Sequence, residues 1–207
     1  MNYKKIFNVV GVVAVAVVFC VGCNQNDKLG ESPNDGKGDD SYRYNGGVKI
    51  GNQTWMAENL NRATINSKCY GNSADSCAKY GRLYTWTDAK KSCPTGWHLP
   101  SDAEWNTLIT AAGGASTAGK KLKATSGWGD DDNNYPKGTD EYGFSALPGG
   151  TFNTSDGFHS AGYIGFWWSG TKAQSVTAWF LDMSSYSDNV NRSDGNDMLL
   201  SVRCVQN

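Results

Sequence analysis

The spacing of apolar residues predicts one helix clearly. Ser101 and Glu104 form a capping-box sequence, in which each residue can satisfy a free amide at the start of a helix. The apolar residues that follow recur at helical intervals and form one stripe: Trp105, Leu108, Ile109 and Ala112. Gly113 and Gly114 then favour a helix end. We expect a helix between these two signals.

The other regular elements are expected to be short. A β-hairpin is predicted over residues 48–56, because strand-forming residues flank the turn sequence Gly51-Asn52. A second, shorter helix is expected over residues 87–92. Three later segments have the composition of strands: 165–169, 177–183 and 198–205.

Two regions lack a regular pattern. Residues 59–80 are polar and interrupted, and residues 125–161 are rich in glycine after a short turn near residue 122. A loop as long as the second region is usually functional or packed by its own aromatic residues. No internal repeat is visible, which argues against a solenoid or a propeller.

The N-terminus carries a targeting pattern. Lys4 and Lys5 precede a mostly apolar stretch, residues 6–21, which is shorter than the ~20 residues that a helix needs to cross a bilayer. A basic start, an apolar middle and a small residue before the cleavage site are typical of a signal peptide. We expect that signal peptide over residues 1–22.

The sequence Val21-Gly22-Cys23 resembles a bacterial lipobox, in which the cysteine becomes the lipidated first residue of the mature chain. Cys20 stands where that pattern usually has leucine. The resemblance implies a lipid on Cys23. By analogy with Gram-negative sorting, Asn24 implies the outer membrane, with the domain on the cell surface or on the periplasmic face. Ordinary secretion with cleavage elsewhere is the alternative.

Composition separates a tether from a domain. Residues 23–47 are rich in Asp, Asn, Gly and Ser and have little apolar surface to bury, so we expect a solvated tether. All eight tryptophans lie in the expected domain, residues 48–207. The chain carries 19 Lys and Arg against 20 Asp and Glu. This near-neutral balance, without a basic stripe, argues against a nucleic-acid partner.

The domain contains four cysteines, Cys69, Cys77, Cys93 and Cys204. An even number in an exported chain predicts two disulfides, and counting alone leaves three pairings open. Cys69 and Cys77 enclose a short loop, which favours a bond between them. A zinc site is the competing interpretation, but the chain has no CxxC pair and its two histidines are far apart in sequence.

Six ordered sequence blocks resemble the Fibrobacter succinogenes major paralogous domain. They are VKIGNQTWMAENLN, YGRLYTW, CPTGWHLPSDAEWNTL, GTDEYGFSALPGG, GFWWSG and SVRCV. The resemblance covers residues 48–207, nearly the whole mature chain. It implies a fold more than an activity, because the biochemistry of that family is poorly defined.

A more distant similarity concerns C-type-lectin-like folds and their formylglycine-generating-enzyme relatives. Residues 86–108 are similar to the region where a helix cysteine precedes His-Leu and a second helix, and SVRCV is similar to the terminal strand. The resemblance implies an α+β, loop-rich fold with two short helices on small antiparallel sheets. It also implies a Cys93–Cys204 disulfide, which leaves Cys69–Cys77 as the second.

Aromatic residues are candidates for sugar binding, because an exposed ring can stack on the apolar face of a sugar. Trp167 and Trp168 are adjacent on an expected strand and therefore point to opposite faces. The other candidates lie in or beside the long loop: Trp128, Tyr135, Phe158 and Tyr163. The alternative for each of them is that it fills the core of a loop-rich domain.

Two acidic segments are calcium candidates, because closely spaced Asp and Asn side chains supply the oxygen ligands that calcium prefers. They contain Asp130, Asp131 and Asp132 in the long loop and Asp188, Asp194 and Asp197 before the last strand. Neither segment matches an EF-hand loop, and the Glu-Pro-Asn and Trp-Asn-Asp signatures of calcium-dependent lectins are absent. Solvated turns are the alternative.

Catalysis has little support in the sequence. No common hydrolase, zinc-protease or phosphate-loop motif is present, and His98 is expected to be a hydrogen-bonded structural residue. The catalytic cysteines of the formylglycine-generating relatives have no counterpart here. We therefore expect a non-catalytic cell-surface module that binds polysaccharide or another envelope ligand. A structural or protein-binding component of the cell envelope is the alternative, and a carbohydrate-active enzyme is a third reading.

Overall fold

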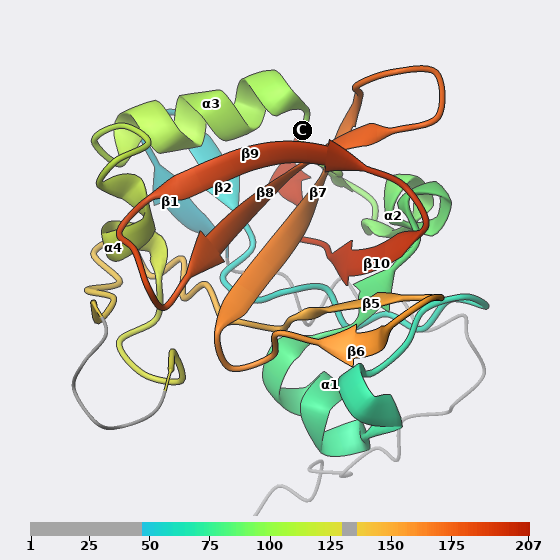
Figure 1. Cartoon of the computed structure of the whole chain (residues 1–207). Coiled ribbons are helices and arrows are strands. Elements are labelled where there is room, and N and C mark those ends of the chain that lie inside the picture. Colours follow the sequence, from blue (N-terminus) through green and yellow to red (C-terminus); the bar gives the residue numbers. More distant parts are fainter. Residues whose placement is uncertain (1–46, 130–135) are drawn as a thin grey trace, which may run out of the picture. The chain divides into compact units, whose positions relative to one another are not determined.

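The computed structural model describes residues 47–129 and 136–207, and these form a mixed α/β body (Figure 1). The coarse α+β prediction is therefore confirmed. Several predictions lie outside the described residues: the signal peptide, the lipidated Cys23, the tether up to residue 46, and Asp130, Asp131, Asp132 and Tyr135. Within the described part, no helix is long and apolar enough to cross a membrane.

The smaller sheet has four strands in the order β1-β2-β11-β4. Their bounds are β1 (Val48–Ile50), β2 (Gln53–Trp55), β4 (Trp97–His98) and β11 (Val205–Gln206). β1 and β2 form the predicted hairpin, with Ile50 paired to Gln53 across the turn. Gly51 has a φ of +60° in that turn, which a residue without a Cβ adopts without strain.

The larger sheet has the order β6-β5-β10-β7-β8-β9, and β3 also pairs with β10. Its strands are β3 (Leu83–Tyr84), β5 (Thr151–Asn153), β6 (Gly157–His159), β7 (Ile164–Lys172), β8 (Ala178–Ser184), β9 (Val190–Gly195) and β10 (Met198–Ser201). The first two predicted strands correspond to β7 and β8. The third is divided, because the chain leaves this sheet after β10 and enters the smaller sheet as β11.

Some elements are absent from the sequence prediction. β9 occupies a segment expected to be a turn, because its Asn, Asp, Ser and Gly residues disfavour strands. It forms as an edge strand that pairs with β8 from Val190 to Gly195, and most of its side chains are exposed. The hairpin of β5 and β6 lies within the region expected to be irregular.

The described residues contain four α-helices and one 3₁₀ turn. They are η2 (Tyr70–Asn72), α1 (Ala74–Tyr80), α2 (Trp86–Ser92), α3 (Asp102–Ala111) and α4 (Ala118–Leu122). α2 and α3 are the two predicted helices. α1 was not expected, because it is one short helix in a polar segment and its N-cap side chain makes no capping hydrogen bond.

The predicted capping box starts α3. The Ser101 hydroxyl accepts from the Glu104 amide at 3.3 Å, and a Glu104 carboxylate oxygen accepts from the Ser101 amide at 2.7 Å. At the other end, the Gly114 amide donates to the Ile109 carbonyl at 2.8 Å and closes the helix. The stripe of apolar residues faces the core, since Trp105 and Leu108 are almost fully buried.

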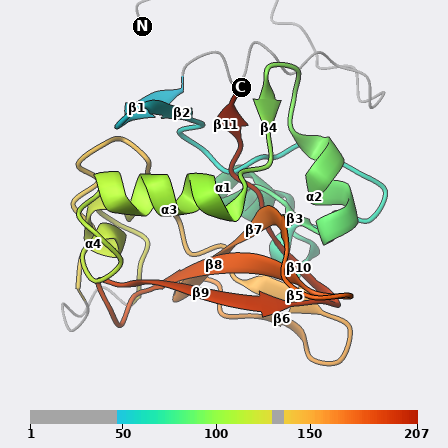
Figure 2. The same ribbon diagram turned by 90° about the horizontal axis from the view of Figure 1, so that it is seen from above.

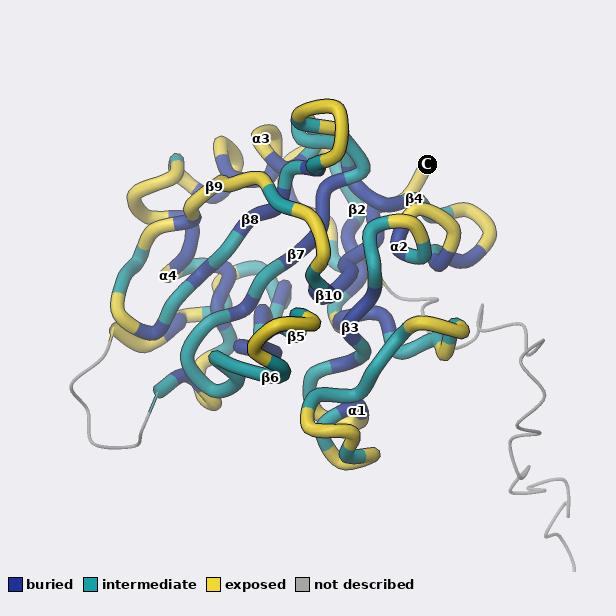
Figure 3. The backbone as a smooth tube through the Cα atoms, turned by 45° about the vertical axis from the view of Figure 1, so that its right-hand side comes forward, coloured by how far each residue is buried: buried dark blue, intermediate teal, exposed yellow. Residues whose placement is uncertain are grey.

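Two hydrophobic cores meet at β7. Trp167 packs in the first core with Trp105 of α3 and Leu181 of β8, whereas Trp168 packs in the second with Ala89 of α2. The two rings thus point to opposite faces, as expected for neighbours on a strand. α3 lies between the smaller sheet and the outer strands of the larger one (Figure 2), and the buried residues follow β7, β8 and β10 (Figure 3).

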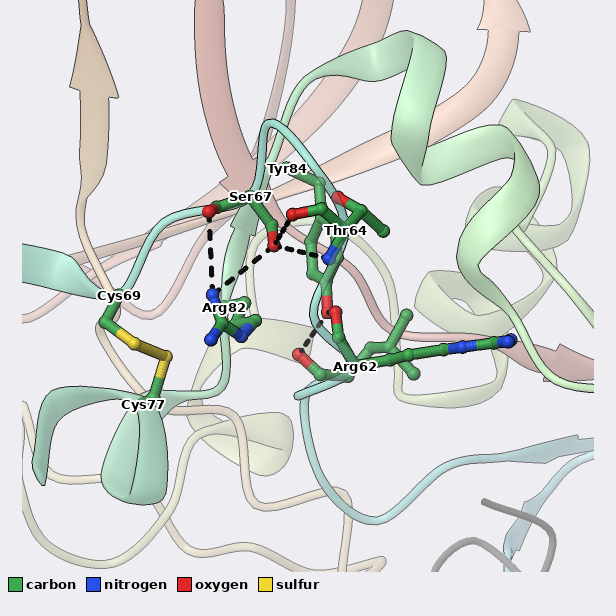
Figure 4. The surroundings of a disulfide bond; sticks show 8 residues. Arg62, Thr64, Ser67, Cys69, Cys77, Arg82 and Tyr84 are labelled. Carbon is green, nitrogen blue, oxygen red and sulfur yellow. Dashed lines mark hydrogen bonds between the residues drawn. A yellow bond between two sulfur atoms is a disulfide. The ribbon is translucent and has the colours of Figure 1, made fainter. Parts of the chain in front are cut away.

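Both disulfides implied by the sequence are present. Cys93, the C-cap of α2, is bonded to Cys204 between β10 and β11, over a sequence separation of 111 residues. Cys69 is bonded to Cys77 of α1 and closes a loop with a separation of 8 residues. Figure 4 shows that a hydrogen-bonded loop flanks this second disulfide, in which Arg82 donates to the Ser67 hydroxyl at 3.4 Å.

Candidate functional site

The three predicted tryptophans offer no exposed ring. Trp167 and Trp168 are at most 1% exposed and Trp128 is 8% exposed. Each indole N–H donates within the domain: Trp128 to Ala146 O, Trp167 to Asn59 Oδ1 and Trp168 to Tyr84 O. Stacking on a sugar requires an accessible face, so the expectation of a stacking platform is wrong for these residues. They fill the core instead.

The other described aromatic candidates lie in two separate clusters. Phe158 on β6 is half-buried against Phe152, at 4.7 Å between ring centroids, and against Tyr70, at 5.3 Å. Tyr163 stacks on Tyr186, with centroids 6.1 Å apart and an interplanar angle of 9°. Tyr186 is 57% exposed and was not singled out by the sequence.

The three described acidic candidates do not come together. Asp188 precedes β9, whereas Asp194 and Asp197 lie at the other end of that extended strand. Among residues 47–129 and 136–207, no group of three His, Cys, Asp or Glu side chains could hold a metal ion. A calcium site that combines these three residues is therefore not formed by the described part of the chain.

Near Asp188, the backbone carbonyl oxygens that could have bound a metal ion accept hydrogen bonds from a lysine. The Lys123 ammonium is fully buried and donates to the carbonyls of Pro136 at 3.2 Å, Ser184 at 3.0 Å and Ser187 at 2.8 Å. Burial lowers the pKa of Lys123, and the Asp188 carboxylate opposes that shift. Three acceptors match the three N–H donors of an ammonium. The positive charge near Asp188 is therefore the Lys123 ammonium.

The polar cluster at the start of α3 is structural. His98 Nε2 lies 2.7 Å from Glu104 Oε1, and its other ring nitrogen lies 2.7 Å from Asn207 Oδ1. Burial by itself raises the pKa of Glu104, but hydrogen bonds from Ser101 and His98 outweigh it and lower that pKa overall. The Ser101 hydroxyl donates to Glu104 Oε2 at 2.7 Å, which adds to the capping box of α3.

A pocket of about 360 Å³ opens beside the start of α2. We call it the Trp86 pocket. Four segments meet there: the start of α2, the β5–β6 turn, the β7–β8 connection and the β9–β10 turn. Its lining combines an indole, apolar side chains and short polar groups: Thr85, Trp86, Thr87, Thr154, Trp168, Val176, Ala178, Gly195, Asn196, Asp197, Met198 and Leu199.

Two contacts fix the ring of Trp86. Its indole N–H donates to the Ser169 carbonyl at 2.8 Å, and the Lys90 ammonium lies 3.8 Å from the ring centroid. The side chain is half-buried. Asp197, in the β9–β10 turn, also lines the pocket and has a φ of +52°, a conformation that Asp adopts more readily than most residues. Asp197 is the only acid among the lining residues.

Two residues of this pocket lie in or next to segments that the sequence analysis singled out. The predicted helix over residues 87–92 begins next to Trp86, and Asp197 is one of the calcium candidates. The sequence did not predict that Trp86 and Asp197 line one pocket, because the pocket forms where turns distant in sequence come together in the fold. Among the aromatic residues predicted to bind ligand, Trp168 borders the pocket, but it is only 1% exposed and belongs to the core.

A second cleft of about 320 Å³ lies between α1 and the segment that follows β2. We call it the Arg203 cleft, because the buried Arg203 lines it together with Asn59 and residues of α1. No sequence pattern identified it.

Together, these features define a disulfide-bonded α+β domain whose described residues form an aromatic pocket and a polar cleft, among other hollows. The chain belongs to the family described as the Fibrobacter succinogenes major domain, whose family model matches residues 48–206. Comparisons with curated proteins and with solved structures found no match.

Proposed function

We propose that this domain is a non-catalytic binding module for polysaccharide, displayed by a lipid on Cys23 at the outer membrane. The Trp86 pocket is the observation that carries the proposal. A sugar has apolar C–H faces and polar hydroxyls, and the pocket sets an indole beside hydroxyl, amide and carboxylate groups. Its volume of about 360 Å³ falls within the range of small-ligand sites, ~300–1,000 Å³.

Binding without hydrolysis is supported by the same lining. Glycosidases use two carboxylates that face each other across the scissile bond. Asp197 is the single carboxylate that lines the Trp86 pocket. One carboxylate can accept hydrogen bonds from sugar hydroxyls, but a glycosidase of this kind needs a second one as its nucleophile or its facing base.

A lectin-like arrangement is part of this proposal. The Cys93–Cys204 bond, which links a helix to the C-terminal segment, supports it. So does the order of the elements, in which α2 and α3 precede β7 and the terminal strands. The anchor is testable by itself: cells fed a clickable palmitate analogue are expected to label the wild-type chain and not Cys23→Ala.

The pocket is tested with a glycan array and the full-length chain in detergent, with calcium and with a chelator. Trp86→Ala is expected to abolish binding to the glycans that the wild type retains. Trp179→Ala is the matched control, because Trp179 is also half-buried and also carries a cation, Arg192, 3.5 Å from its ring centroid, but does not line the pocket.

If the two tryptophan variants bind glycan equally well at matched folded fractions, the Trp86 pocket is not the glycan site. An array without any bound glycan, combined with crosslinking in cells to one envelope protein, would favour a protein-binding role instead.

A further inference from the structure

Arg203 is a buried charge without a direct counter-ion. It lies between β10 and β11 and is 1% exposed. Its Nε and Nη2 donate to Asn59 Oδ1 at 3.1 and 2.8 Å, and its Nη1 donates to the carbonyls of Met56 and Phe144. All these acceptors are neutral oxygens. Among the described residues, no carboxylate forms an ion pair with Arg203.

One N–H group of the guanidinium has no hydrogen-bond acceptor in the described structure. It has five N–H groups, and the four hydrogen bonds above leave one on Nη2 without an acceptor in the described structure. Asn59 Oδ1 already accepts from Trp167 as well as from Arg203, so it has little capacity left. Burial lowers the pKa of Arg203 to about 9, while Glu58 and Asp140 act against that shift, and the side chain stays charged at neutral pH.

The Arg203 cleft lies directly beside this charge. Its other polar lining residues include Asn61, Tyr80 and Ser145, and its two exposed charged residues are Lys79 and Glu58. The cleft thus carries two positive charges against one negative charge. Burying a cation without a paired anion is unfavourable, and an anion that enters the cleft would relieve that cost. A planar carboxylate suits a guanidinium donor.

We propose that the Arg203 cleft is a second ligand site, which takes a carboxylate-bearing sugar unit such as a uronic acid of an acidic polysaccharide. Its volume of about 320 Å³ is at the lower end of small-ligand sites, ~300–1,000 Å³, which favours a single ring. Glu58 at the cleft favours a singly charged ligand over a dianion. The site is separate from the Trp86 pocket and does not depend on it.

Isothermal titration of the full-length chain in detergent, at constant ionic strength, tests this site with sodium D-glucuronate, D-glucose and sodium phosphate. Glucuronate is expected to bind at least tenfold more tightly than either of the others. Glu58→Gln is expected to tighten glucuronate binding by about 3- to 10-fold, because it removes a like charge, and Lys79→Gln is expected to weaken it by a similar factor.

Glu141→Gln and Lys120→Gln are the matched controls, since both residues are exposed and neither lines the cleft. They are expected to leave glucuronate affinity unchanged. A gain of affinity in Glu58→Gln is a result that a purely structural Arg203 would not produce. Equal affinities for glucuronate and glucose, equal affinities for glucuronate and phosphate, or an unchanged Glu58→Gln variant would each overturn the proposal. Trp86→Ala is expected to retain glucuronate binding, so the two sites can fail separately.

Discussion

The two ends of the β7–β8 hairpin are held in different ways. At the end where Ile164 pairs with Ser184, the Lys123 ammonium binds three carbonyls and fastens α4 to the turns around it. At the other end, α2 is fastened covalently through Cys93. The first arrangement uses every donor of the buried group. The second is a covalent bond and uses no polar side chain.

Several of the residues predicted to bind a ligand lie at the Lys123 end, whereas the Trp86 pocket lies at the α2 end. Trp128, Tyr163 and Asp188 drew attention to the Lys123 end, because aromatic and acidic residues gather there along the chain. Their polar groups serve the fold: the Trp128 indole N–H is bonded to Ala146 O, and the Tyr163 carbonyl accepts from the Ser185 amide. The ring of Trp128 is also only 8% exposed, whereas the half-buried Trp86 keeps part of its ring accessible to a ligand.

The largest effect is expected from removal of the covalent fastening. The variant Cys93→Ala/Cys204→Ala loses a bond that spans 111 residues, and chain entropy predicts a loss of about 4.7 kcal/mol for a loop of this size. Urea unfolding of the full-length chain measures it. Because α2 then loses its anchor, glycan binding at the Trp86 pocket is expected to weaken even where the variant is still folded.

The second disulfide is the internal comparison. Cys69→Ala/Cys77→Ala opens a loop with a separation of only 8 residues, for which the same argument predicts less than about 3 kcal/mol. It lies away from α2, so the Trp86 pocket is expected to bind normally. A larger loss of stability in this variant than in Cys93→Ala/Cys204→Ala would show that loop length does not govern the two bonds.

A smaller effect is expected at the Lys123 end. Lys123→Met keeps most of the side-chain volume but leaves three buried carbonyls without donors, and we expect a destabilisation of about 2–4 kcal/mol. Lys120→Met, on the exposed side of the same helix, is expected to change stability by less than about 0.5 kcal/mol. Urea unfolding curves of equal midpoint for the two variants would contradict a fastening role for Lys123.

The fold was predictable where local rules are strong. The capping box of α3 and the Gly51-Asn52 hairpin depend on neighbouring residues, and both formed as expected. β9 was not predicted, because its composition disfavours a strand and it is stabilised by backbone pairing with β8. Local composition does not reveal that an edge strand can be polar on most of its positions.

The candidate sites were less predictable for a related reason. Trp86 and Asp197 are far apart in sequence and line the same pocket only because four separate segments converge there. Arg203 lies in a block that identifies the family, yet nothing in the sequence indicates that its charge is buried without a carboxylate in an ion pair among the described residues. Burial and hydrogen-bond saturation decide which polar residues remain available, and both are properties of the assembled fold.

The smallest effect on stability is expected at Asp197, where stability and binding should separate. Asp197→Gly removes the side chain from a position with a φ of +52°. The relief of steric strain stabilises the folded state, and the added chain entropy of glycine stabilises the unfolded state. Because the two effects nearly cancel, the free energy of unfolding should change by less than about 1 kcal/mol. Loss of the pocket's one carboxylate is expected to weaken glycan binding about tenfold. Asn72→Gly, at a φ of +57° outside the pocket, makes the same backbone change without touching the lining. If both variants bind glycan as the wild type does, the carboxylate of Asp197 does not contact the ligand, and the polar side of the pocket must be assigned to its threonines and Asn196 instead.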